Sequence, residues 1–351
     1  MEDTGQLGIK PATQNPRVIN YMDEIITFVS TLVDKGFAYV SEGDVYFRVA
    51  KSNNYAKLAN KTLEDLEIGA SGRTDAETER KENPLDFALW KAAKEGEVSW
   101  DSPWGPGRPG WHIECSVMAT EILGDTIDIH GGGADLEFPH HTNEIAQSEA
   151  KTGKTFANYW MHNGFVNVDN EKMSKSLGNF VTVHDMLQTV DGQVLRFFLA
   201  TQQYRKPINF TEKAIHDAEV NLKYLKNTHS LPLTEQVNQA ELQTYLDAFQ
   251  EAMDDDFNTA NGVTVLFDMA KWINSGNYDQ TVKDAFEKML QVFGIVFEEE
   301  VLDEDIEKLI EERQAARANK DFATADRIRD ELAAQGIKLL DTKEGVRWTR
   351  D

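Results

Sequence analysis

The chain has 351 residues, of which 40% are hydrophobic and 27% charged, and these ordinary proportions exclude a collagen-like or wholly disordered chain. The formal net charge of −24 argues against a broad nucleic-acid-binding surface, and no apolar run approaches the roughly 18 residues that a membrane span needs. Because the sequence begins without a secretory signal and its single cysteine cannot form an intramolecular disulfide, we expect a cytosolic protein of two or three domains with no membrane partner.

The first hundred residues predict a helix followed by a hairpin. Asn15 suits an N-cap and Pro16 a first helical position, and apolar residues then recur at helical spacing up to Leu32. Residues 37–49 alternate about a turn at 41–44, which predicts two antiparallel strands. The remaining expectations for this part are a short helix over 61–69, a surface loop over 71–83 and an irregular loop rich in Trp, Pro and Gly over 100–110.

From residue 111 the pattern is typical of an α/β domain and then of an all-α one. A helix is predicted over 111–123, and a short buried strand follows at 126–130. Capping-box spacing at Thr182 and Asp185 predicts a helix start, and beyond Thr211 apolar residues recur at helical spacing. The other predicted elements are a helix opened by Pro139, a strand at 163–168, a C-terminal helix over 322–334 and two short strands at 337–340 and 346–348.

Histidines gather near the only cysteine, Cys115. Five of the eight lie within 51 residues: His112, His130, His140, His141 and His162. His140 and Glu144 are four residues apart on a predicted helix, so they share a face, and with Cys115 they offer the nitrogen, oxygen and sulfur donors that zinc accepts. The alternatives are a buried cysteine with satisfied core histidines, a solvated Glu144, or His141 in place of His140.

Two further segments favour nucleotide binding. A turn at Gly131-Gly132-Gly133 is expected between a strand and a helix, where parallel sheets bind nucleotides, and Asp135 is placed to accept hydrogen bonds from a ribose. A plain tight turn with a capping aspartate is the alternative. Lys172 and Lys175 lie three residues apart in a small polar loop, where ammonium groups can neutralise transferring phosphates, unless the loop is simply an exposed basic one.

Charge changes sign near the C-terminus. Residues 298–312 carry nine acids and one base, whereas residues 313–351 carry nine bases and seven acids. Any RNA contact is therefore expected after this change, through arginines on phosphates or an aromatic ring on bases. The candidates are Arg313, Arg317, Arg327, Arg347 and Trp348; the alternatives are surface salt bridges for the arginines and a small core for the tryptophan.

These motifs together resemble one enzyme family. KMSKS at 172–176 is similar to the second signature of class I aminoacyl-tRNA synthetases. GWHIECS at 110–116 and DIHGGGADLEFPHHTNEIAQ at 128–147 resemble the cysteinyl-tRNA synthetases specifically. The resemblance continues through YWMH at 159–162, MDDDFNT at 253–259, KDFATAD at 320–326 and GVRW at 345–348, and so covers essentially the whole chain.

The resemblance implies a fold that is α/β plus all-α. It contains the C-terminal half of a split Rossmann catalytic domain with its connective insertion, then a helical bundle and a small mixed α/β tail that binds the anticodon. The implied divisions are residues 1–107 for the insertion, 108–210 for the Rossmann half, 211–300 for the tRNA-binding bundle and 301–351 for the tail. The family's HIGH-type signature and an N-terminal zinc-binding cysteine are absent from the sequence, so we expect the chain alone to have little or no activity.

The implied activity is cysteine–tRNA ligation by a monomer, with L-cysteine, ATP with magnesium, and cysteine tRNA as substrates. Cys115, His140 and Glu144 match three of the four ligands of one zinc ion, and Trp111 matches the residue beside the amino-acid pocket. By the same resemblance Lys172 and Lys175 act in catalysis, and the ATP site comprises Lys175, Asp135, Gly132 and Gly133.

Two other functions remain open on the sequence. The related ligase of mycothiol synthesis shares the catalytic motifs but lacks an extended helical and anticodon-binding tail, and about 140 residues follow Thr211 here. A catalytically inactive remnant that binds tRNA is the non-enzymatic alternative.

Overall fold

The computed structural model describes residues 2–62, 78–174, 178–235, 237–297, 304–342 and 345–350. They form two compact units, Met1–Ile295 and Val296–Asp351, each described by itself below. The helix expected over 61–69 and the first part of the loop expected over 71–83 lie outside the described residues. Within the described ranges, no helix combines the length and the apolar character that crossing a membrane requires.

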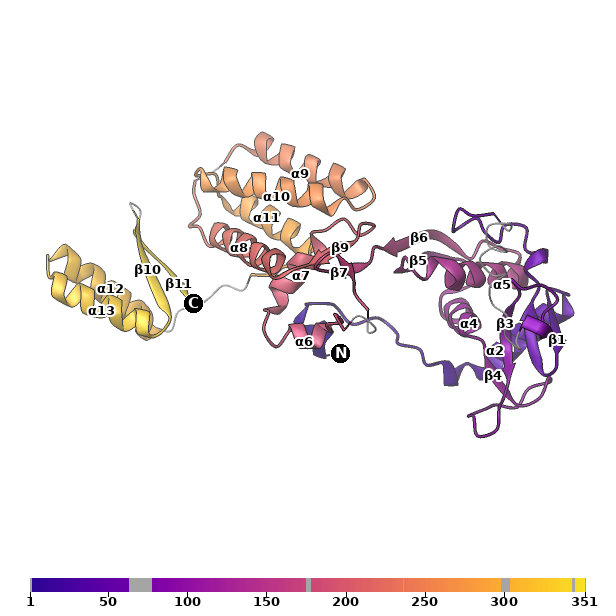
Figure 1. Cartoon of the computed structure of the whole chain (residues 1–351). Helices are drawn as coiled ribbons and strands as arrows, with labels where there is room; N and C mark the ends of the chain where they lie inside the picture. Colours follow the sequence, from indigo (N-terminus) through magenta and orange to yellow (C-terminus); the bar gives the residue numbers. More distant parts are fainter. Residues whose placement is uncertain are drawn as a thin grey trace. The chain divides into compact units, whose positions relative to one another are not determined.

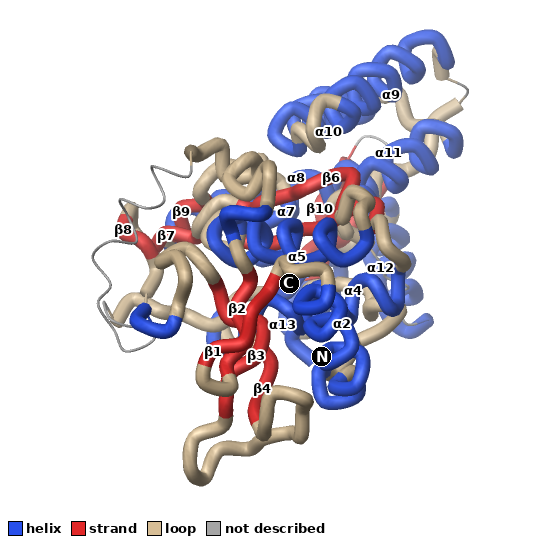
Figure 2. Tube along the Cα trace, turned by 90° about the vertical axis from the view of Figure 1, so that its right-hand side faces the viewer, coloured by secondary structure: helices blue, strands red, loops and turns tan. Residues whose placement is uncertain are grey.

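A short helix α1 (Glu2–Gln6) precedes a helix packed on a four-stranded antiparallel sheet (Figures 1 and 2). Helix α2 begins six residues after Pro16, because Arg17 has extended backbone and residues 18–20 form a 3-10 turn. The predicted hairpin is confirmed, and the segment expected to be irregular over 100–110 contributes the fourth strand. The elements are α2 (Met22–Asp34), β1 (Ala38–Ser41), β2 (Asp44–Phe47), β3 (Phe87–Ala92) and β4 (Gly107–Pro109), with the strands in the order β1-β2-β3-β4.

The region that carries most of the histidines has α/β architecture. Helix α4 (Trp111–Leu123) has the predicted bounds, and strand β5 (Ile127–Gly133) pairs in parallel with β6 (Ala157–Asn163). Helix α5 (Thr142–Thr152) follows a π-helical turn at Glu137–His141.

The prediction of a turn at Gly131–Gly133 is wrong. These glycines are the last residues of β5, in register with Met161–Asn163 of β6. Glycine is required at 132 because a Cβ atom there would lie 2.9 Å from both the His141 ring and the Leu136 side chain. The end of the strand therefore lies close beside His141, whose ring approaches position 132 closely.

A second small sheet follows. The strand predicted over 163–168 is divided, since β6 ends at Asn163 and β7 (Val166–Val168) belongs to a sheet of order β8-β7-β9. The predicted capping box is confirmed, with Thr182 and Asp185 bonded to each other's backbone, although helix α6 has only four residues. The remaining elements are β8 (Glu171–Lys172), α6 (Val183–Met186), α7 (Gly192–Ala200) and β9 (Ile208–Phe210).

The predicted helical bundle is confirmed, and Figure 1 shows its helices. Side-chain oxygens cap the helices, for example Thr211, which accepts from the Ala214 amide, and Asp279, which accepts from the Val282 amide. Fully buried residues such as Leu266 and Phe286 fill the space between them. The helices are α8 (Glu212–His229), α9 (Gln239–Asp254), α10 (Thr259–Asn274) and α11 (Gln280–Val292).

The C-terminal unit is two helices and a hairpin. Its core consists of Ile306, Ile328, Leu332 and Ile337, against which Trp348 packs. The predicted helix over 322–334 and the two strands are present, the strands each somewhat longer than expected. The elements are α12 (Glu304–Ala318), α13 (Phe322–Ala334), β10 (Ile337–Thr342) and β11 (Gly345–Arg350).

Candidate active site

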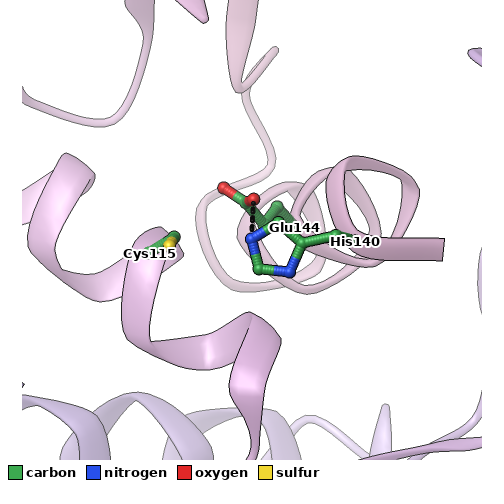
Figure 3. A group of neighbouring side chains, drawn as sticks. All are labelled: Cys115, His140 and Glu144. Atoms are coloured by element: carbon green, nitrogen blue, oxygen red, sulfur yellow. Dashed lines mark ion pairs between the residues drawn. The ribbon is translucent and has the colours of Figure 1, made fainter. Parts of the chain in front are cut away.

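Helices α4 and α5 bring the three predicted metal ligands together. Gln147 of α5 donates hydrogen bonds to the His112 carbonyl (2.6 Å) and to the Ser116 hydroxyl (2.7 Å) of α4, which fixes the two helices against each other. One ligand atom from each of Cys115, His140 and Glu144 then lies within 4.8 Å of the other two. Figure 3 shows Cys115 on one helix facing the pair His140 and Glu144 on the other.

The Glu144 carboxylate is the centre of the cluster. It is fully buried, and Oε1 lies 2.9 Å from Nε2 of His140 while Oε2 lies 3.0 Å from Nε2 of His130. Burial by itself raises the pKa of Glu144, but the two adjacent imidazoles outweigh burial and lower it. The carboxylate is therefore charged at neutral pH and offers two oxygens to a cation.

The donor set fits a zinc ion. Both Glu144 oxygens and Nε2 of His130 lack a directed hydrogen bond from any described residue, although the ion-pair distances are short. Buried polar atoms without partners are costly unless a water or an ion satisfies them. Burial, followed by the charges of Glu144 and Glu114, raises the pKa of Cys115 to about 12, so that without a cation its thiol keeps its proton.

Four more histidines surround this cluster, and of these the sequence suggested a role only for His141, as an alternative ligand. Nδ1 of His112 lies 2.8 Å from Nδ1 of His140, which turns the Nε2 atom of His140 toward Glu144. Nδ1 of His141 lies 2.8 Å from Nε2 of His162. Their concentration in one stretch of sequence was the available signal, but the spacing could not show which imidazoles touch.

The alternative ligand His141 also reaches Glu144. His130, His141 and Glu144 form a second group whose ligand atoms lie within 4.8 Å of one another. Burial lowers the pKa of both His112 and His141 to about 4, so both rings are neutral at pH 7. The first group differs from the second in supplying sulfur, which zinc binds well.

Trp111 lies beside the cluster, in contact with His140. Its ring packs against that of His140 at a tilt of 30°, with 4.2 Å between centroids, yet the residue is 57% exposed. It lines a cavity of about 200 Å³ together with Phe87, His112 and two lysines, Lys81 and Lys91. The structure therefore places Trp111 beside a space that a small substrate can enter.

Of the residues predicted for ATP binding and catalysis, Gly132, Gly133 and Asp135 lie at the end of β5, and Lys172 is the last residue of β8. Asp135 is exposed, and its Oδ1 lies 2.4 Å from the position that a Cβ on Gly133 would take, so the two residues are in close contact. The ammonium of Lys172 sits 4.2 Å above the Phe165 ring. Asn179 closes the loop by accepting from the Ser174 amide (2.9 Å), whereas Lys175 lies outside the described residues.

The structure separates the residues predicted to contact tRNA. Arg317 and Arg327 are exposed, and Arg327 forms an ion pair with Glu331 at 3.3 Å. Arg313 is only 5% exposed, which does not fit a direct RNA contact, and Trp348 packs on the core of the unit. The Arg347 side chain is not among those described.

Comparisons with known families divide the chain into three matched segments. Residues 1–220 match the model of the tRNA synthetases class I (C) catalytic domain. Residues 248–298 match the DALR domain, and residues 299–348 match the cysteinyl-tRNA ligase anticodon binding domain.

Curated relatives match over the whole chain. A cysteine–tRNA ligase of Streptococcus thermophilus is 95% identical and one of Streptococcus agalactiae 81% identical, and the chain covers 78% of the length of each. Among solved structures, methionyl-tRNA synthetase of Mycobacterium tuberculosis aligns over 83% of this chain and 74% of its own, with a TM-score of 0.55 at 15% identity, which shows a shared fold. The chain belongs to the cysteine–tRNA ligase family of class I aminoacyl-tRNA synthetases.

Proposed function

We propose that the reaction of this site is activation of L-cysteine with ATP and transfer to cysteine tRNA, with Cys115, His140 and Glu144 as ligands of one zinc ion, and that it runs slowly in this chain because the HIGH-type signature is absent from the sequence. The convergence of these three side chains on one point carries the proposal. Zinc bound there supplies a soft Lewis acid that coordinates the substrate's thiolate and disfavours the hydroxyl of serine. Trp111 stacks on His140 and lines the adjacent cavity, so it bounds the space for the amino acid.

The nucleotide half of the reaction involves the end of β5 and the loop after β8. We assign Asp135 to the ribose of ATP, with Gly132 and Gly133 beside it at the end of the strand. Lys172 and Lys175, together with the magnesium ion of ATP, would neutralise the negative charge that develops on the phosphates as the cysteine carboxylate attacks the α-phosphate. The products of this step are cysteinyl-adenylate and pyrophosphate.

The second step transfers the cysteinyl group from the adenylate to a ribose hydroxyl at the 3′ end of the tRNA. We assign tRNA binding to the helical bundle and to the C-terminal unit, where the exposed Arg317 and Arg327, and Arg347 of the same unit, offer positive charge. The match of residues 299–348 to an anticodon-binding domain supports tRNA as the acceptor, rather than the amino sugar of the mycothiol ligase. Because Arg313 is buried and Trp348 packs against the core, we assign those two residues to the stability of this unit.

The test compares cysteine with serine on the zinc-loaded chain. We expect isothermal titration to show cysteine binding at least about 100-fold more tightly than serine, because thiolate coordination is lost with serine. Cysteine-dependent ATP–pyrophosphate exchange and charging of cysteine tRNA measure the two steps. A chain that binds tRNA but shows neither zinc-dependent cysteine binding nor exchange would instead support the tRNA-binding remnant.

A further inference from the structure

The acidic motif at 253–259 takes no part in the site described above, yet its backbone has an unusual conformation. It joins α9 to α10, and both Asp256 and Phe257 have a φ of 52°, in the left-handed region. Aspartate enters this region fairly readily, whereas a bulky phenylalanine does so at an energetic cost. Phe257 is also half exposed, so burial of its ring does not explain the conformation.

The Asp256 carboxylate accepts hydrogen bonds from two residues of the loop that follows α7. Its Oδ1 accepts a hydrogen bond from the Tyr204 hydroxyl at 2.8 Å and from Nη2 of Arg205 at 3.1 Å. Its Oδ2 accepts from Nε of Arg205 at 2.5 Å, which makes the arginine contact bidentate. The Arg205 guanidinium also lies over the Tyr204 ring, 5.1 Å from its centroid, so the three side chains form one unit, the Asp256 clamp.

The loop held by the clamp packs directly on the end of β6. The Gly164 amide donates to the Tyr204 carbonyl at 2.7 Å. A Cβ atom at Gly164 would lie 2.4 Å from the carbonyl carbon of Lys206, so no side chain fits between the two backbones. Gly164 is two residues from His162, which contacts His141 at 2.8 Å in the histidine cluster.

We propose that Asp256 is a positioning residue, which sets the end of β6 and its His162 against helices α9 and α10 by clamping Tyr204 and Arg205. This inference rests on the proposed function, because it gives the clamp a role in transfer to tRNA. Adenylate formation requires no tRNA. The transfer step, in contrast, requires that the 3′ end of a tRNA bound to the helices lie next to the adenylate. A second contact at the same junction, from the Thr259 hydroxyl to the Gln202 carbonyl at 2.8 Å, fixes the direction in which α10 leaves it.

The first test is independent of catalysis. Hydrogen exchange is measured on the 351-residue chain and on Asp256→Ala, Asp256→Asn and a control, Asp268→Ala, which removes a comparably exposed ion pair with Lys271 on α10. We expect Asp256→Ala to speed exchange of the Gly164 amide about tenfold, with Asp256→Asn in between and the control unchanged. Faster exchange confined to residues 255–259 would overturn the proposal.

The second test separates the two chemical steps. We expect Asp256→Ala to lower kcat for charging cysteine tRNA about tenfold, while cysteine-dependent ATP–pyrophosphate exchange stays within about twofold and Asp256→Asn recovers part of the loss. Equal loss of both activities, or no loss of either, would contradict a positioning role. Exchange by the unsubstituted chain tests the proposed function separately, so the failure of one proposal does not imply failure of the other.

Discussion

The Nε2 atom of His140 lies 2.9 Å from Oε1 of Glu144, four residues further along the chain and fully buried. A charged carboxylate in the interior is costly unless it is paired or coordinates a metal. This pair, with the Cys115 thiol close by, is therefore a structural requirement of the region as well as a candidate ligand set.

Removing the charge of Glu144 should weaken zinc binding. Glu144→Gln keeps the size of the side chain but loses the anionic oxygen ligand, so we expect zinc affinity to fall at least about 10–100-fold, the range found even for outer-shell changes. Metal content by mass spectrometry after dialysis against a chelator measures the effect. Glu121→Gln, an exposed position on α4, should retain the metal; retention by Glu144→Gln as well would contradict the ligand assignment.

Zinc binding should release a proton from Cys115. Because burial raises the pKa of Cys115 to about 12 in the metal-free chain, the thiol is protonated at neutral pH and must ionise to become a ligand. The zinc affinity should therefore rise with pH, by about tenfold per unit from this group between pH 7 and 9. Affinities measured across that range give the slope. In Cys115→Ser the slope of log affinity against pH should be smaller by one, because one proton fewer is released. An unchanged slope would show that the thiol is not a ligand.

The metal-free chain should lose stability in mild acid. Burial lowers the pKa of His112 and His141 to about 4, whereas histidines in an unfolded chain titrate near 6.5. Between these pH values the unfolded state binds more protons than the folded state, so the free energy of unfolding falls as the pH falls from about 6.5 to 4, by a few kcal/mol in total.

Urea denaturation at several pH values measures this dependence. Replacing both histidines, His112→Gln with His141→Gln, removes the two groups and should flatten the profile over the same interval. If the pH profile of this variant were as steep as that of the unsubstituted chain, groups other than these two histidines would cause the loss of stability in acid.

Replacing Lys172 should slow activation without disturbing the metal. Lys172→Ala removes an ammonium group assigned to the phosphates, and we expect cysteine-dependent ATP–pyrophosphate exchange to fall about 100-fold or more. Lys154→Ala is a suitable control, because that lysine is paired with Asp125 at the other end of β6. Zinc content should be the same in all three proteins, and normal exchange by Lys172→Ala would contradict its assignment.

Removing the C-terminal unit should separate tRNA binding from metal binding. A chain ending at Leu302 lacks α12, α13 and the β10–β11 hairpin, and we expect it to lose affinity for cysteine tRNA in a filter-binding assay. Its zinc content should be unchanged, since Cys115, His140 and Glu144 all lie in the first compact unit. Loss of metal from this shortened chain would contradict the division into separate regions.

Local chemistry made several elements predictable. The helix at 111–123, the hairpin about residues 41–44 and the capping box at Thr182 and Asp185 each depend on residues within one turn or one strand pair, and each is present. The start of α2 was predicted too early. Asn15 and Pro16 are typical of a helix start, but the backbone of the next residue, Arg17, is extended. The three glycines of β5 were misjudged because only the neighbouring strand and the His141 ring explain them.

The sequence by itself determined the family, several of the helices and strands, and which side chains are candidates to bind zinc, because these follow from motifs and short-range spacing. Only the tertiary structure decided which imidazoles meet Glu144, that Arg313 is buried, and that Asp256 reaches Tyr204 and Arg205 some fifty residues away. Contacts of this kind join segments that are distant in the chain, and their geometry depends on how whole helices and strands pack rather than on any local pattern.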